Sequence, residues 1–332
     1  MKRKIYSLCC MSLLLGTVVL IGCSSNDDSP STPPSSSTSS KGEIPANQDN
    51  GKNNNSNPDN PSSSGDSGNN GGSGSGGSSD GTGGSGGSTG STSEWTLVFE
   101  DDFEGTDETP NPEYWTLTPK GDKTWNRYMS GSYDQAYQKD GYLYLFGMLS
   151  NGQYLTGGIE TLDKYSFTYG QVKCRARFLK QPQGNHTGIW MMPEPPAQTW
   201  PRSGEIDIME HLNDESVIWE TAHYWDGTTE ETGEDAESHT STSVDNDEFN
   251  VYGIIWDKNS VSFTVNGVVH HTYTNSDPSN EDFSYQYPFT KPFYLILSQS
   301  LGGEGTWEGP ITDSELPAVF QIDWIKVWQK SE

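Results

Sequence analysis

The chain has 332 residues, of which 46 are Asp or Glu and 19 are Lys or Arg, so its formal net charge at pH 7 is -27. This negative charge excludes a nucleic-acid partner and favours a neutral or weakly charged one unless a local basic patch overrides it. Three of the four cysteines lie within the first 23 residues, so Cys174 has no internal disulfide partner and is expected to be a buried, inert thiol.

The N-terminal 22 residues have the pattern of a secretory signal peptide. A basic start at residues 1–4 precedes an apolar run at 8–21, too short to span a membrane comfortably. The run ends in Leu-Ile-Gly-Cys at 20–23, which resembles a bacterial lipobox and implies lipidation of Cys23. The acidic pair at 27–28 resembles an export signal of surface lipoproteins, so we expect an outer-membrane lipoprotein exposed on the cell surface. The alternative is a plain signal peptide with a chance cysteine.

Residues 23–93 are expected to form a disordered tether. The segment consists mainly of Ser, Gly, Asn, Pro, Asp and Thr, and it lacks the large apolar residues that a core requires. A Gly/Ser-rich coil of this length spans on the order of 45 Å. We expect the protein to contact the membrane only through its lipid anchor.

Residues 94–332 are expected to form one all-β domain. Alternating β-favouring runs occur at 142–146, 172–178, 188–192, 251–256, 261–265 and 293–298. Asn266-Gly267 predicts a two-residue hairpin, because both residues tolerate the positive φ of a type I′ turn. We predict a two-sheet jelly-roll sandwich, concanavalin-like, with a cleft and no helix longer than a turn or two. The acidic, Ser/Thr-rich run 226–248 is expected to be a flexible loop.

Three carboxylates are spaced along one predicted strand, in the run Gly-Glu-Ile-Asp-Ile-Met-Glu-His at 204–211. Side chains of a strand alternate between faces, so Glu205 and Asp207 share one face while Ile206 and Ile208 point into a core. A one-residue β-bulge at residues 208–209 would turn Glu210 back onto the acidic face. The sequence therefore predicts three carboxyl groups in a row.

Such a row of like charges is costly unless the site uses it. Retaining glycosidases need a carboxylate nucleophile and a carboxylic acid roughly 5 Å apart, roles that suit Glu205 and Glu210. Asp207 would hydrogen-bond the nucleophile and help keep Glu210 protonated. The alternatives are a solvated acidic edge strand and a cation site.

At these residues the sequence resembles glycoside hydrolase family 16, whose bulged motif Glu-x-Asp-x-x-Glu is matched by Glu205, Asp207 and Glu210. Flanking landmarks at 99–103, 169–172, 200–203 and 320–328 agree with it. The resemblance implies an endo-acting, retaining β-glycosidase with a glycan-binding cleft and a poly- or oligosaccharide substrate. It implies no cofactor for catalysis, and a monomer is expected.

Aromatic residues are candidates for stacking on sugar rings in the cleft. The chain has 11 Trp, of which four near predicted strand ends or loops are chosen: Trp190, Trp200, Trp225 and Trp307. A core role is the alternative for each. The resemblance adds four candidate substrate-binding positions: Asn126, Arg175, His223 and Gln299.

One departure from the family concerns substrate choice. Glucan-cleaving members commonly read Gly-x-Trp-Pro-Ala where this chain has Gly184-Asn185-His186-Thr187-Gly188. Replacement of the aromatic wall by His186 or Thr187 opens room for an axial 4-hydroxyl and adds hydrogen-bonding groups, which favours galactose over glucose. We therefore predict an endo-β-galactosidase acting on host or mucin-type glycans. The alternatives are an endo-β-1,3- or mixed-linkage β-glucanase, with a nearby loop supplying the aromatic, and a non-enzymatic surface glycan-binding lipoprotein.

Metal binding is expected at most in a structural role. None of the six histidines is paired at zinc-ligand spacing on a helix. The resemblance implies a structural calcium, for which Glu100 or Asp102 together with Asp323 are the candidates. The alternative for Asp323 is a plain surface aspartate.

Overall fold

The computed structural model describes residues 95–195, 200–225, 235–279 and 285–331 of the chain. The expected signal peptide 1–22, the lipidation site Cys23 and the tether 23–93 lie outside the described residues. Within the described ranges, no helix combines the length and apolar character needed to cross a membrane.

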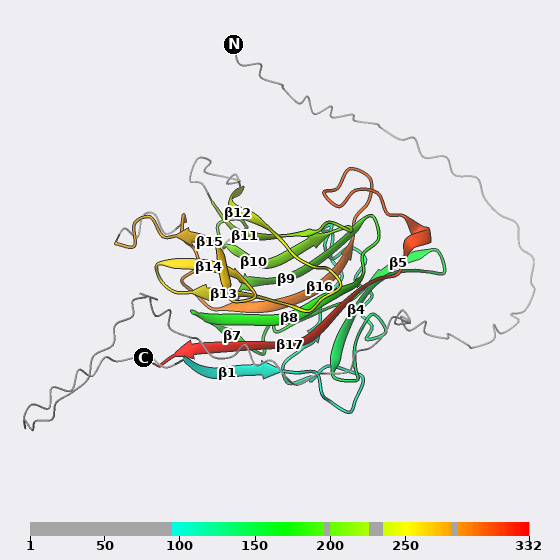
Figure 1. The fold of residues 1–332 in the computed structure, drawn as a ribbon, viewed down its shortest axis with the longest axis horizontal. Coiled ribbons are helices and arrows are strands. Elements are labelled where there is room, and N and C mark those ends of the chain that lie inside the picture. Colours follow the sequence, from blue (N-terminus) through cyan, green and yellow to red (C-terminus); the bar gives the residue numbers. More distant parts are fainter. Residues whose placement is uncertain (1–94, 196–199, 226–234, 280–284, 332) are drawn as a thin grey trace, which may run out of the picture. The chain divides into compact units, whose positions relative to one another are not determined.

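Two antiparallel β-sheets make up the described part of the chain, which confirms the all-β, two-sheet prediction (Figure 1). Its only helical segment is the 3₁₀ turn Asp313–Glu315. The nine-stranded sheet has the order β15 (Val268–Thr274), β14 (Ser260–Val265), β13 (Asn250–Trp256), β8 (Gly170–Lys180), β17 (Ala318–Lys330), β4 (Tyr142–Ser150) and β3 (Ala136–Lys139), with β1 (Trp95–Asp101) also paired to β17 and β5 (Gln153–Thr156) to β4.

The eight-stranded sheet carries the carboxylate motif on one of its central strands. Its order is β12 (Asp235–Ser243), β11 (Val217–Trp225), β10 (Glu205–Leu212), β9 (Asn185–Pro193), β16 (Phe293–Leu301), β6 (Gly158–Glu160) and β2 (Thr116–Leu117), with β7 (Ser166–Phe167) also paired to β16. All six runs expected to be strands are strands, in β4, β8, β9, β13, β14 and β16.

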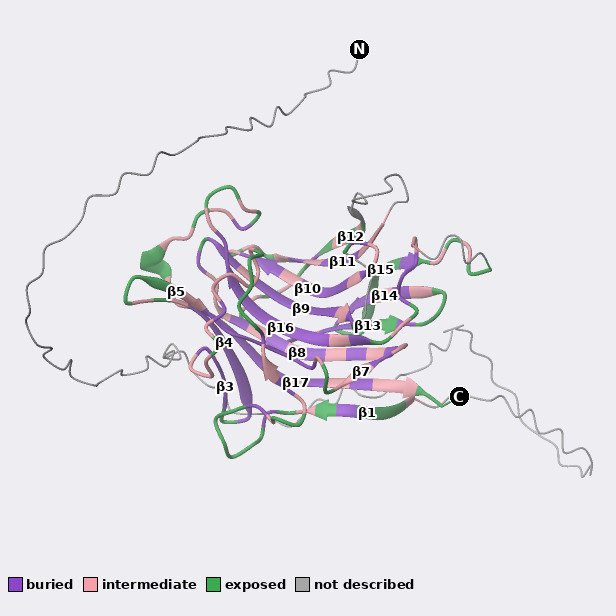
Figure 2. Ribbon diagram, turned by 180° about the vertical axis from the view of Figure 1, so that it is seen from behind, coloured by how far each residue is buried: buried purple, intermediate pink, exposed green. Residues whose placement is uncertain are grey.

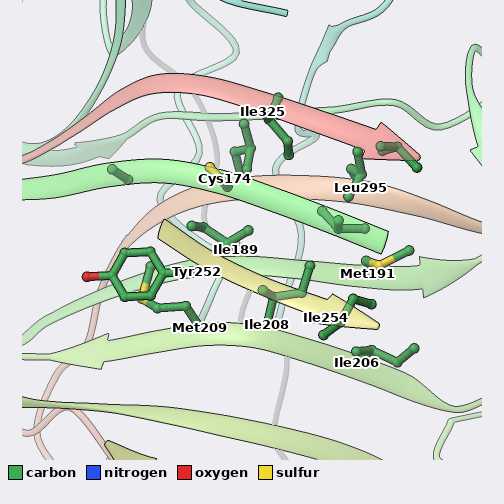
Figure 3. Packing of buried hydrophobic residues seen from close by; sticks show 14 of the residues in the cluster. Cys174, Ile189, Met191, Ile206, Ile208, Met209, Tyr252, Ile254, Leu295 and Ile325 are labelled. Atoms are coloured by element: carbon green, nitrogen blue, oxygen red, sulfur yellow. The ribbon is translucent and has the colours of Figure 1, made fainter. Parts of the chain in front are cut away.

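The core lies between the two sheets and follows from period-2 alternation. On β8, Val172, Cys174, Ala176 and Phe178 are buried while the residues between them are partly exposed. Figure 3 shows Cys174 and Ile254 of one sheet facing the apolar residues of β9 and β10. Each large apolar side chain buried here contributes about 1.5–3 kcal/mol. Figure 2 shows this burial along the central strands, with exposed residues at the turns and on β1.

Cys174 is buried, as the sequence predicts. The side chain is fully buried, and burial raises its pKa, with the nearby Asp323 carboxylate adding to the effect. A thiol with a raised pKa holds little thiolate, the nucleophilic form.

Two turn and loop predictions have different outcomes. Asn266 and Gly267 both have positive φ, 52° and 80°, and connect β14 to β15 as the type I′ prediction requires. Of the run 226–248 expected to be a flexible loop, residues 226–234 lie outside the described residues, and the expectation is wrong for residues 235–243. Residues 235–243 form β12, which pairs with β11 from Val217↔Ser243 to Trp225↔Asp235. The Ser and Thr residues that suggested a loop are compatible with a strand at the edge of a sheet.

Candidate active site

The bulge in β10 places the three carboxylates on the outer face of the eight-stranded sheet, here called the cleft face. The register of β10 against β9 shifts between Asp207 and Met209, as expected. Ile206, Ile208 and Met209 are all fully buried in the core (Figure 3), so two consecutive residues point inward. Glu210 therefore lies on the same side as Glu205 and Asp207.

The strand register identifies the neighbours of each carboxylate on the cleft face. On β11, His223 lies opposite Glu205, Thr221 opposite Asp207, and Trp219 opposite Glu210. On β9, Trp190 lies opposite Asp207. Cross-strand neighbours on one face lie about 5 Å apart at Cβ, so these side chains surround the carboxylates.

Each carboxylate has its own polar partner. The indole Nε1 of Trp200 donates a hydrogen bond of 2.6 Å to Oε2 of Glu205. His223 Nε2 lies 3.1 Å from Oδ2 of Asp207. His186 Nε2 lies 3.0 Å from Oε1 of Glu210. Their different surroundings allow the three chemically similar groups to differ in protonation.

Burial makes the first two carboxylates weaker acids than usual. Burial, followed by the charge of Asp207, raises the pKa of Glu205 well above its ordinary value, although His223 and Trp200 oppose the shift. Burial and the charge of Glu210 raise the pKa of Asp207 to about 6, against the effect of His223. Such a cluster of carboxyl groups with perturbed pKa values at a cleft is typical of a catalytic site.

A cleft of about 460 Å³ opens beside the third carboxylate, toward β11 and β12. It is lined by Glu210, Trp219, Thr221, His223, Glu237, His239 and Trp307. Trp219, Thr221, Glu237 and His239 were not among the residues expected from the sequence. Two of these, Trp219 and Thr221, were detectable, because they alternate at period 2 with the predicted His223 on one strand.

The four candidate tryptophans lie in different settings. Trp307 is 56% exposed and Trp200 is 44% exposed, so both present ring surface to solvent at the site. Trp190 is buried, and its Nε1 donates a 3.0 Å hydrogen bond to Ser298 Oγ. The guanidinium of Arg202 lies 3.7 Å from the centre of the Trp225 ring.

The loop that carries Asn126 lies beside Trp190. The Trp125 ring contacts the Trp190 ring edge-on at 4.7 Å. The side-chain oxygen of Asn126 accepts a 3.1 Å hydrogen bond from the backbone N–H of Lys123, within its own loop. This loop is therefore close to the row of cleft-face residues that contains Asp207.

Two candidate substrate-binding residues do not reach the cleft, and these predictions are wrong. Arg175 projects from the outer face of the nine-stranded sheet, where its guanidinium pairs with Asp323 and lies over the Phe249 ring. Gln299 is fully buried, and its amide oxygen accepts a 3.0 Å hydrogen bond from Thr187 Oγ1. Its neighbours Ser298 and Ser300 hold the cleft-face positions of β16, so alternation turns Gln299 inward.

His186 occupies the cleft face, but both of its ring nitrogens face carboxylates. Nε2 lies 3.0 Å from Glu210 Oε1 and Nδ1 lies 3.3 Å from Glu308 Oε1. Thr187, its neighbour, is fully buried and does not line the cleft. Trp307 contacts the His186 ring edge-on at 5.6 Å, so a loop does bring an aromatic residue to this position.

The carboxylates proposed for calcium do not fit a metal site. Glu100 Oε1 lies 2.8 Å from Lys326 Nζ, and Asp323 pairs with Arg175. Asp102 accepts a hydrogen bond from the backbone N–H of Glu104. Among the described residues, no group of three His, Cys, Asp or Glu side chains is arranged to hold a metal ion. The calcium prediction therefore finds no support in this donor set.

Comparison with known proteins agrees with this geometry. The chain is 36% identical over 249 residues to a keratan-sulfate endo-1,4-beta-galactosidase of Sphingobacterium multivorum, with coverage of 71% of this chain and 56% of that protein. It is 28% identical over 264 residues to glucan endo-1,3-beta-glucosidase A1 of Niallia circulans, with coverage of 70% and 38%. The chain thus spans about half or less of the length of these relatives.

Two solved structures are similar over their whole length. One is described with endo-acting O-glycanases of the human gut microbiota that initiate mucin breakdown; it is 31% identical, with coverage of 71% of this chain and 100% of that one and a TM-score of 0.63. The laminarinase of Rhodothermus marinus is 28% identical, with coverage of 72% and 99% and a TM-score of 0.63. The family model described as glycosyl hydrolases family 16 matches residues 124–326, and the chain belongs to this family.

Proposed function

We propose that the chain is a retaining endo-β-glycosidase that hydrolyses internal bonds of a glycan by double displacement. In the first step a carboxylate oxygen of Glu205 attacks the anomeric carbon while Glu210 gives its proton to the departing glycosidic oxygen. In the second step Glu210 takes a proton from water, which attacks the same carbon and releases Glu205. The observation that carries this proposal is the bulge that brings Glu205, Asp207 and Glu210 onto one face.

The contacts of Glu205 suit a nucleophile. Trp200 donates a hydrogen bond to one carboxylate oxygen, which fixes the orientation of the group. The charge of Asp207 raises the pKa of Glu205, and His223 partly offsets this effect. A carboxylate with a raised pKa is more basic and forms a stronger bond to the anomeric carbon.

We propose a galactose-containing glycan, such as poly-N-acetyllactosamine or a mucin-type O-glycan, as the substrate. The identity to the keratan-sulfate endo-β-galactosidase and the similarity to the O-glycanase structure support this choice. The imidazole of His186 at the position where glucan-cleaving relatives carry an aromatic wall also supports it, because an axial 4-hydroxyl needs this room.

A β-1,3-glucanase is the second candidate, and one observation favours it. Trp307 from the 302–309 loop contacts the His186 ring at 5.6 Å and places an aromatic side chain close to the missing wall. The similarity to the Rhodothermus marinus laminarinase is in keeping with this alternative. A shielding Trp307 would restrict the site to sugars with an equatorial 4-hydroxyl.

A substrate panel separates the candidates. Purified protein is incubated with poly-N-acetyllactosamine, keratan, mucin O-glycans, laminarin and mixed-linkage β-glucan, and the products are analysed by mass spectrometry. The galactosidase proposal predicts internal cleavage with galactose at the new reducing end. Rapid depolymerisation of laminarin alone would replace it with the glucanase. Binding of one of these glycans without any cleavage would instead indicate a surface glycan-binding protein.

We further propose that the protein is a monomeric lipoprotein, acylated at Cys23 and displayed on the outer membrane. The basic start, the apolar run and the Leu-Ile-Gly-Cys ending support this location. Cys23→Ala should release the protein from the membrane or mislocalise it, as shown by fractionation. External protease should cut within residues 24–93 on intact cells, whereas full protection would place the protein in the periplasm.

A further inference from the structure

His186 connects the proposed acid/base residue to a second, more deeply buried carboxylate. Its Nε2 faces Glu210 at 3.0 Å and its Nδ1 faces Glu308 at 3.3 Å. The side chains of His186 and Glu210 are 14% and 15% exposed, whereas that of Glu308 is 4% exposed. Glu210 lines the cleft, whereas the buried Glu308 lies behind it on the other side of the His186 ring.

The loop at residues 302–309 holds Glu308 in a fixed position. The backbone N–H of Gly303 donates to the carbonyl of Gly309 at 2.9 Å, and Gln183 Nε2 donates to the carbonyl of Glu308 at 3.2 Å. A Cβ on Gly302 would lie 2.5 Å from the Cβ of Glu308, so this close approach requires glycine. The neighbouring residue, Trp307, lines the cleft.

The charges around His186 favour its protonated form. Burial lowers its pKa, but Glu210 and Glu308 together outweigh burial and raise the pKa to about 10. Asp207 also interacts with His186 electrostatically and is stabilised by its charge. His211, from β10, has its pKa lowered to about 4 by burial and is neutral at pH 7. Burial opposes ionisation of Glu308, but His186, the backbone N–H of Glu308 and the Thr306 hydroxyl together outweigh burial, and the pKa falls to about 2.

We propose, on the basis of the role assigned above to Glu210, that Glu308 is a positioning residue that acts through His186 to orient Glu210 and to stabilise its carboxylate form. In the first step the proton of Glu210 moves to the glycosidic oxygen as its bond to the anomeric carbon breaks. The negative charge that remains on Glu210 then faces the imidazolium of His186. Glu308 balances that cation, so no isolated charge is left buried.

The test compares leaving groups that need different amounts of acid catalysis. Wild-type protein and the Glu308→Gln variant are assayed on whichever of poly-N-acetyllactosamine and laminarin the wild type cleaves. They are also assayed on the 2,4-dinitrophenyl β-glycoside of a disaccharide taken from the polymer that the wild type cleaves. Dinitrophenolate leaves without a proton, so kcat/KM should fall about 30-fold or more on the polymer and less than about threefold on the aryl glycoside. Glu308→Asp should restore part of the lost activity.

The matched control is Glu304→Gln, which removes the same charge from an exposed position of the same loop and should leave both rates unchanged. Equal loss on both substrates would indicate a purely structural role for Glu308 and would overturn the proposal, as would wild-type rates on both. The assignment of Glu210 is tested separately by Glu210→Gln. If that variant keeps wild-type turnover of the polymer, the proposed function itself fails.

A spectroscopic measurement avoids dependence on activity. Histidine ¹⁵N NMR at pH 8, with the His186 signals assigned by comparison with His186→Gln, should show two protonated ring nitrogens in the wild type. In Glu308→Gln the midpoint of this titration should move to lower pH, because one of the two stabilising charges is gone. An unchanged midpoint would contradict the coupling.

Discussion

His223 Nε2 lies 3.1 Å from Asp207 Oδ2, and His223 is also the β11 residue directly opposite Glu205. One imidazole thus offsets the charges of two adjacent carboxylates. Asp207 is the largest electrostatic contribution that raises the pKa of Glu205, after burial. The acidity of the proposed nucleophile therefore depends on its neighbour two residues along the strand.

Asp207→Asn should move the acid limb of the kcat/KM profile to lower pH. Removal of the neighbouring negative charge favours ionised Glu205, so the pKa of Glu205 falls. kcat should fall as well, because a less basic nucleophile reacts more slowly. Asp214→Asn, an exposed carboxylate in the turn after β10, is the control. An acid limb that moves to higher pH in Asp207→Asn would contradict the coupling.

Glu205→Gln and Glu210→Gln should each reduce turnover of the glycan by about 1,000-fold or more, because each retains the side-chain shape but loses the ionisation that its step requires. Thermal unfolding and glycan binding should be retained. Sodium azide should partly rescue Glu205→Ala and give a glycosyl azide of inverted, α configuration. If Glu205→Gln keeps more than a few per cent of activity, Glu205 is not the nucleophile.

Net retention of the β anomer is the stereochemical prediction. Two consecutive displacements at the anomeric carbon restore its configuration, whereas direct attack by water would invert it. Proton NMR recorded within the first minutes of hydrolysis, before mutarotation, distinguishes the two. A first-formed α signal would rule out the double displacement.

Local pattern was sufficient to predict the strand that carries the three carboxylates. The alternation of Ile206 and Ile208 with acidic residues, together with the Met209 that breaks it, predicts a bulge, and the structure has one. The Asn266-Gly267 hairpin is also confirmed. Its prediction needed only these two residues, because both tolerate the positive φ that the turn requires. Both features are set by neighbouring residues in the chain.

The surrounding residues were harder to predict because their positions depend on strand pairing. Arg175 lies in a strand whose side chains alternate between buried and partly exposed, and Gln299 lies in a strand that is buried on both faces. The sequence does not show which face of which sheet forms the cleft. Glu308 lies 98 residues after Glu210 and is brought to His186 only by the loop after β16. A lone glutamate in a Gly-rich loop carries no periodic signal, so sequence reasoning missed it.

Trp219→Ala should weaken glycan binding more than it affects chemistry. Trp219 lines the cleft opposite Glu210, and its ring lies 6.4 Å from that of Trp307. Loss of this apolar surface should raise KM roughly tenfold, which corresponds to about 1.4 kcal/mol, with kcat changed less. Trp324→Ala, on the outer face of the other sheet, is the control. A tenfold loss confined to kcat would argue against a role in binding.

Glu220→Gln should stabilise the protein at pH 8 and have little effect at pH 5. Glu220 points into the core on β11, is fully buried and accepts a 3.0 Å hydrogen bond from Thr242 Oγ1. Burial raises its pKa from 4.5 to about 7. The folded state therefore binds this proton more tightly than the unfolded state, so the free energy of unfolding decreases as pH rises from about 4.5 to about 7.

Gln resembles the protonated form of Glu220 in shape and hydrogen bonding but cannot ionise, so the variant avoids this loss. The expected gain at pH 8 is on the order of 2 kcal/mol in the free energy of unfolding, measured by urea denaturation at both pH values. Glycan turnover should be unchanged, because alternation places Glu220 on the opposite face from Trp219 and Thr221. If the variant is less stable than the wild type at pH 8, the prediction is wrong, and neighbouring groups stabilise the ionised form of Glu220 more than burial destabilises it.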